Sequence, residues 1–88
     1  MANIYLAGER IPPEDLPDFK AVINRGETKF KVTVTARAMF SDAQLEACTM
    51  GSIVAASVDD VSYTGVVTGI GFRESYSICQ IEEAVVGN

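Results

Sequence analysis

The stretch TKFKVTVTARAMF (residues 28–40) alternates apolar and polar side chains along its whole length. One face would carry Phe30, Val32, Val34, Ala36, Ala38 and Phe40, and the other Lys29, Lys31, Thr33, Thr35 and Arg37. Strict alternation with β-branched residues predicts a long strand that is buried on one face only. Because its polar face presents cations at alternating positions, we take Lys29, Lys31 and Arg37 as candidate interaction residues.

A short helix is predicted directly after this strand, over residues 42–50. Ser41 and Gln44 have the spacing of a capping box, in which each side chain satisfies a backbone amide at the start of a helix. Gly51 suits the left-handed residue that commonly ends a helix. Signals for both the start and the end of this helix are therefore present in the sequence.

The remaining segments predict further strands. The C-terminal half should form strands over 52–58, 61–72 and 76–86, with turns at Asp59–Asp60 and at residues 73–75. Residues 18–23 are the expected hairpin partner of the long strand, joined to it by residues 24–27, and a helix over 18–25 is the alternative. A short strand at 4–6 precedes an irregular acidic arm at about 8–17, which contains Pro12, Pro13 and Pro17.

These elements make the fold class mainly β, a β-rich α+β chain. Five or six short strands and one helix are accommodated most simply in a small antiparallel barrel or sandwich, with the helix at about 42–50 closing one end. We expect residues 1–88 to form a single domain, because 88 residues is near the lower size limit for a self-sufficient core.

Three glycines of GVVTGIGFRE (residues 65–74) resemble a phosphate-binding loop at first sight. Such a loop needs glycines that open a helix after a strand, whereas Gly65, Gly69 and Gly71 lie inside a strand pattern. Glycine inside a strand marks a bend, a bulge or a close approach of another backbone. We therefore interpret the three as structural glycines, which would share one face of a regular strand and let it coil tightly.

The composition argues against several function classes. The chain has no histidine, the commonest metal ligand and the usual proton carrier near neutral pH. Asp59–Asp60 are turn aspartates that should point apart, and Cys48 lacks a basic neighbour that would activate it. The sequence therefore predicts no enzyme, no cofactor and no metal site.

The location of the protein is inferred from its cysteines and its apolar segments. No apolar run approaches the roughly 18 residues that span a bilayer, so no membrane association is expected. The N-terminus has no secretory pattern, which favours reduced, buried thiols for Cys48 and Cys79 and a location in a host cytoplasm. Incorporation into a virion is the alternative location.

Charge is segregated along the chain, whose net charge is −5. The cations cluster at residues 20–37, whereas from residue 42 onward seven acids stand against Arg73 alone. Direct binding of nucleic acid is not expected of such an acidic chain. Among the acids, Glu82 and Glu83 are the candidate partners of the cationic strand in a contact between copies.

The closing segment VSYTGVVTGIGFRESYSICQIEEAVVGN (residues 61–88) carries a resemblance to a known group of proteins. Its G-x-V-x-x-I-G pattern at Gly65, Val67, Ile70 and Gly71, a turn, a returning strand and the final Val86–Gly87 resemble the closing hairpin of tail-tube, baseplate and head–tail joining proteins of long-tailed bacteriophages. The resemblance covers about a third of the chain. It implies a β-barrel or sandwich that works in a ring or stacked assembly, without catalysis.

Two functions from different classes follow. The first is a non-catalytic structural or assembly protein of a virus or prophage, whose partner is itself, in a ring or stack, or another assembly protein. The second is an acidic regulatory or inhibitory module that binds a host protein, for instance by mimicking nucleic acid.

Overall fold

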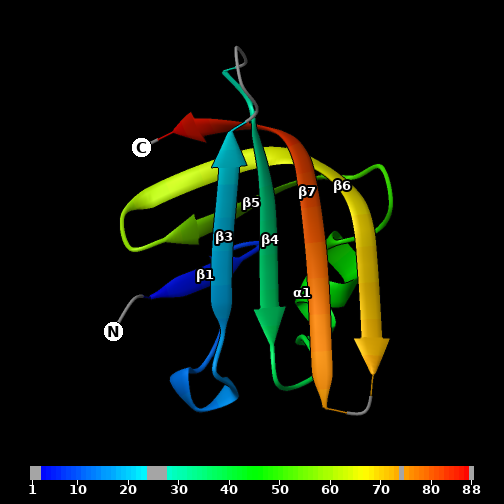
Figure 1. Ribbon diagram of the computed structural model, residues 1–88. Coiled ribbons are helices and arrows are strands. Elements are labelled where there is room, and N and C mark those ends of the chain that lie inside the picture. The colour runs from blue at the N-terminus through cyan, green and yellow to red at the C-terminus, as the bar shows by residue number, and fades with distance from the viewer. Residues whose placement is uncertain (1–2, 24–27, 74, 88) are drawn as a thin grey trace.

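The protein is described by a computed structural model that covers residues 3–23, 28–73 and 75–87 (Figure 1). The elements are β1 (Ile4–Leu6), β2 (Glu9–Arg10), the 3₁₀ helix η1 (Pro13–Asp15), β3 (Asp18–Ile23), β4 (Phe30–Ala36), α1 (Asp42–Ala47), β5 (Ile53–Val58), β6 (Val61–Arg73) and β7 (Tyr76–Gly87). All strand pairs are antiparallel, and the seven strands form one sheet in the order β2-β1-β5-β6-β7-β4-β3. The mainly β class with one short α-helix is confirmed.

The sheet curls on itself into a half-barrel. In Figure 1, β3, β4, β7 and the end of β6 form the front layer, with β1 and β5 behind them. The curl brings β3 and β4 over the beginning of β6, because the ring of Tyr63 lies 5.4 Å from that of Phe19 and 5.2 Å from that of Phe30. The space between the layers is filled by fully buried side chains from both, among them Leu6, Val34, Val67 and Ile81.

The alternation that predicted the long strand is present in β4. Val32, Val34 and Ala36 are buried, while Lys31 and Arg37 are exposed. The strand is shorter than the predicted 28–40, because after Ala36 the chain is held by other elements. The amide of Arg37 donates to the carbonyl of Asp15, and the hydroxyl of Ser77 donates to the carbonyl of Ala38.

The capping box at the start of α1 is confirmed. The hydroxyl of Ser41 accepts from the amide of Gln44, and the side chain of Gln44 accepts from the amide of Ser41. The helix ends at Ala47, three residues before the predicted end, because Cys48 has already left helical geometry. Gly51 does have a positive φ, of 84°, but it serves the turn that leads into β5.

The N-terminal third differs from the prediction in the arm at residues 8–17. Residues 18–23 are a strand, so the helical alternative is wrong over the described part of that range, and residues 24–27 lie outside the described residues. The arm at 8–17 is not wholly irregular, since it contains β2 and η1. Three prolines did not prevent this, because the two residues of β2 precede all of them and Pro13 occupies the first position of η1.

Two β-bulges shape the long hairpin of β6 and β7. The pairing moves from Thr64↔Val85 to Val66↔Glu82, which leaves an extra residue in β7, and from Val67↔Ile81 to Gly69↔Gln80, which leaves Thr68 as the extra residue in β6. A bulge bends its strand and increases the local twist.

The second bulge corrects the prediction that the three glycines share one face. Gly65 lies on the core side with Val67, whereas Gly69 and Gly71 pair with Gln80 and Ile78 on the opposite, outer side. The extra residue Thr68 reverses the alternation between them, since a one-residue shift moves every following side chain to the other face.

Glu83 occupies the bulge of β7 with a φ of 58°, a left-handed conformation that glycine adopts without strain. We expect Glu83→Gly to be more stable than Glu83→Ala by about 1 kcal/mol, although both variants lose the same carboxylate. Chemical denaturation of the two variants measures the difference. At Glu82, which has no positive φ, the alanine variant should be more stable than the glycine variant. If alanine were the more stable substitution at both positions, the assignment of strain to Glu83 would be contradicted.

Candidate functional site

The structure brings two of the predicted interaction residues together within one chain. The ammonium of Lys29 lies 2.8 Å from the carboxylate of Glu83, and both side chains are more than half exposed. An exposed ion pair contributes about 0–1 kcal/mol to stability. The prediction placed Glu82 and Glu83 opposite the cationic strand in a contact between copies, whereas Lys29 and Glu83 pair within one chain, because β4 and β7 are neighbouring strands.

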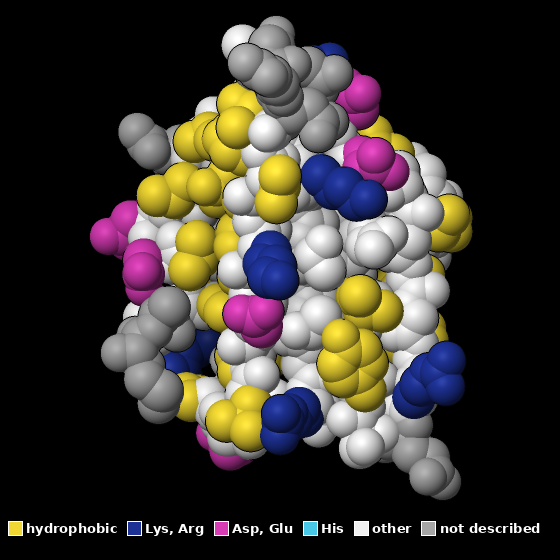
Figure 2. Space-filling model, viewed as in Figure 1, with side chains coloured by type: hydrophobic (Ala, Val, Ile, Leu, Met, Phe, Trp, Pro, Cys, Tyr) yellow, Lys and Arg dark blue, Asp and Glu magenta, His cyan; other side chains and the backbone are white. Residues whose placement is uncertain are grey.

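The other predicted residues are not brought together. Lys31 is exposed and pairs with Val22 of β3, Arg37 is exposed just beyond the end of β4, and Glu82 is half-buried opposite Val66. Figure 2 shows the same dispersion on the front face, where cationic groups stand apart and a wide uncharged area separates some of them. Among the described residues, the front face therefore shows no continuous basic patch.

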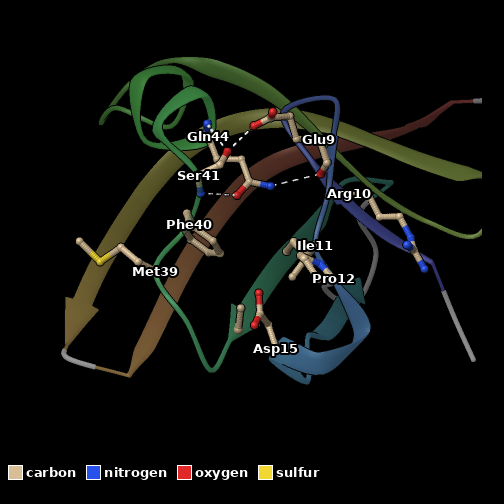
Figure 3. Close-up of a pocket in the computed structure, with 10 residues that line it drawn as sticks. Glu9, Arg10, Ile11, Pro12, Asp15, Met39, Phe40, Ser41 and Gln44 are labelled. Atoms are coloured by element: carbon tan, nitrogen blue, oxygen red, sulfur yellow. Dashed lines mark hydrogen bonds between the residues drawn. The ribbon is translucent and has the colours of Figure 1, made fainter.

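A hollow of about 440 Å³ lies where α1 meets the N-terminal segment (Figure 3). Its lining includes the buried side chains of Ile11 and Phe40 and the carboxylate-bearing residues Glu9 and Asp15. In Figure 3 the carboxylate of Asp15 points towards the space beside Phe40, whereas Arg10 extends away from it. The guanidinium of Arg10 instead donates to the side chain of Asn3, at 3.3 Å.

The polar wall of the hollow is held by hydrogen bonds within the chain. The side-chain amide nitrogen of Gln44, Nε2, donates to the backbone carbonyls of Leu6 and Glu9, at 3.3 and 3.1 Å. The hydroxyl of Ser41 donates to the carboxylate of Glu9. These bonds tie α1 to the β1–β2 hairpin. The amino-acid sequence gives no sign of the hollow, because a capping box does not reveal that its glutamine also bonds residues 35 and 38 positions away.

Cys48 and Cys79 are free thiols, as predicted, and both are buried. Cys48 directly follows α1, and Cys79 lies in the middle of β7. A hydrogen bond with Cys48, together with burial, raises the pKa of the Cys79 thiol above its ordinary value. The thiol of Cys79 is therefore held in its protonated form, which is not the nucleophilic one.

The raised pKa of Cys79 predicts a loss of stability at alkaline pH. The folded protein holds the proton to a higher pH than the unfolded chain, whose thiols ionise near pH 8.5, so stability is complete below that pH and falls above it. The same hydrogen bond lowers the pKa of Cys48, so the comparison is made with a chain that lacks both thiols. Between pH 7 and 9.5 we expect the free energy of unfolding to fall by about 1 kcal/mol more in the wild type than in Cys48→Ala/Cys79→Ala. Urea denaturation at both pH values measures this difference. The titration of lysines and tyrosines cancels in the comparison, because both proteins contain the same ones. Equal losses would contradict the prediction.

No three His, Cys, Asp or Glu side chains within residues 3–23, 28–73 and 75–87 are grouped so that they could hold a metal ion. In the same ranges no helix is long and apolar enough to cross a membrane. Comparison of the chain with known protein families, with curated proteins and with solved structures finds no match.

Proposed function

We propose that this protein is a non-catalytic structural or assembly protein of a virus or prophage, which acts by self-association or by joining other proteins. The bacteriophage tail and head–tail proteins that its C-terminal third resembles work in this way. The observation that carries the proposal is the pair of open edges that the curled sheet leaves at the two sides of its front layer.

The first open edge belongs to β3. It is the last strand of the sheet, and among the described residues no strand pairs with its outer side. Val22 and Ile23 near its end are 57% and 49% exposed. Soluble proteins commonly protect an edge strand with prolines, bulges or several charges, because an open edge pairs readily with another chain. In β3 such protection is limited to Asp18 and Lys20.

The second open edge belongs to the end of β6. The pairing of β5 with β6 ends at Ile53↔Val66, and the backbone of Val67 bonds to Gly51 and Ser52. In the described part of the chain, residues 68–73 pair only with β7. Phe72 in this segment is 43% exposed. An apolar strand with one free edge can add a strand from another molecule.

Sedimentation velocity over a range of protein concentrations tests the proposal. We expect the wild type to sediment as a discrete oligomer or a growing series, and electron microscopy to show rings or stacks. A protein that remains monomeric at high concentration would contradict self-association. The acidic regulatory module would then be the better account, and a host protein captured by the monomer would support it.

A further inference from the structure

We propose that β6 of one copy pairs in antiparallel fashion with β3 of the next copy, in the register that places Arg73 opposite Asp18. This inference rests on the proposed self-association and specifies its partner, a second copy of this chain, and its surface. The two strands form a continuous sheet across the contact, so that the front layer of one molecule extends into that of its neighbour.

Strand direction in the front layer permits this contact. The layer consists of β3, β4, β7 and the end of β6, and each strand is antiparallel to the next (Figure 1). With four strands, the two outermost strands run in opposite directions. A second copy placed beside the first, in the same orientation, therefore brings β3 against β6 with antiparallel direction, and the alternation continues unbroken.

Length and facing select the register. β3 has six residues, and the open part of β6, residues 68–73, also has six. Phe19 of β3 lies on the core side with Val34, and Phe72 of β6 lies on the core side with Ser77. Pairing Phe19 with Phe72 keeps core-side residues together from Arg73 to Gly69, whereas a slip of one residue would oppose the two faces.

Charge and side-chain size agree with this register. It opposes Asp18 to Arg73 on the outer side, and within the described residues neither has an ion-pair partner in its own chain. It opposes Lys20 to Gly71 and Val22 to Gly69. Phe19 and Phe72 form a cross-strand aromatic pair, a favourable combination in antiparallel sheets. Gly69 and Gly71, which the second bulge turns to the outer side, leave room for the longer side chains of β3.

The contact joins two different surfaces of identical molecules, so it is heterologous. Such contacts close into rings when the rotation between copies allows it, and otherwise they extend into filaments. Each copy uses β3 on one side and β6 on the other, so both edges of every copy are paired, except that each terminal copy of an open chain keeps one edge open. This agrees with a ring or stack and excludes a simple two-fold dimer as the final assembly.

A charge swap tests the register. Asp18→Arg and Arg73→Asp should each weaken association about three- to tenfold, because each opposes two like charges. The double variant, which restores opposite charges, should associate within about twofold of the wild type. Asp60→Arg in the β5–β6 turn is the matched control, with the same change of charge away from both edges, and should leave association unchanged. Sedimentation velocity at fixed ionic strength measures all four.

A cysteine pair tests direction and stoichiometry. In the proposed register, a chain with Asp18→Cys and Arg73→Cys oxidised under mild conditions should give a ladder of covalent oligomers on a non-reducing gel. Each single variant should remain monomeric on the gel, since its new thiol has no opposite thiol.

The outcomes separate this inference from the proposed function. Oligomers that show neither rescue by the charge swap nor a covalent ladder would overturn the β3–β6 contact while the assembly function stands. A wild type that is monomeric at every concentration would overturn this contact together with the self-association form of the proposed function. Covalent dimers from a single variant would also overturn the inference, because they would indicate a two-fold contact.

Discussion

Gly65→Ala is expected to destabilise the protein by about 3 kcal/mol or more, and Gly65→Val to prevent folding. Gly65 lies on the core side of β6 opposite the bulge of β7. A Cβ atom at this position would lie 2.5 Å from the carbonyl oxygen of Glu82 and 2.9 Å from the Cα of Ala84. Both are backbone atoms, so neither can move aside without opening the bend of the β6–β7 hairpin.

Gly69→Ala is the matched control for this prediction. It lies in the same strand, and its added Cβ would meet chiefly the amide end of the Gln80 side chain, which can rotate away. We expect a change in the free energy of unfolding within about 1 kcal/mol of zero. Thermal and urea denaturation of both variants measure the contrast. Equal effects at the two positions would show that the backbone approach at Gly65 does not determine the bend.

Gln44→Met is expected to lower the free energy of unfolding by about 3 kcal/mol. Methionine retains much of the volume but makes none of the hydrogen bonds, so the carbonyls of Leu6 and Glu9 and the amide of Ser41 lose their partner. Gln44 is only 3% exposed, and each buried polar group left unpaired costs about 1–3 kcal/mol. The variant should also loosen the β1–β2 hairpin, since Gln44 connects it to α1.

Glu46→Met is the control for that experiment, because it introduces the same residue on the exposed side of the same helix. We expect its effect on stability to be within about 0.5 kcal/mol of zero. Hydrogen exchange should show faster exchange of the amides of β1 in Gln44→Met but not in Glu46→Met. If the two variants unfold at the same urea concentration, the tether between α1 and the hairpin contributes nothing.

The two proposals change how the glycines and the charges are understood. At sequence level Gly69 and Gly71 were assigned to the same task as Gly65, whereas the bulge at Thr68 separates them. Gly65 allows the sheet to bend, and Gly69 and Gly71 leave the outer side of an open edge unobstructed. Likewise Lys29 and Glu83 pair within the chain, so Asp18 and Arg73 are the charges that the proposed contact uses.

Elements whose signals are local can be predicted from the amino-acid sequence. The alternation around Val32 and Val34 predicts β4 and its buried face, and the Ser41–Gln44 spacing predicts the start of α1. The predicted strands of the C-terminal half agree with β5, β6 and β7 to within one residue at each end. Such signals depend on side chains two to four positions apart, which a single sequence displays directly.

Features that depend on residues distant in the sequence become visible only in the folded chain. The bulges at Thr68 and Glu83 arise from how two long strands are forced to bend around the core, and no local pattern marks them. The second hydrogen-bonding role of Gln44 and the pairing of Lys29 with Glu83 likewise depend on segments 35 or more positions apart. Alternation predicts a face only while the register is unbroken, so a single extra residue at Thr68 placed Gly69 and Gly71 on the side opposite to Gly65.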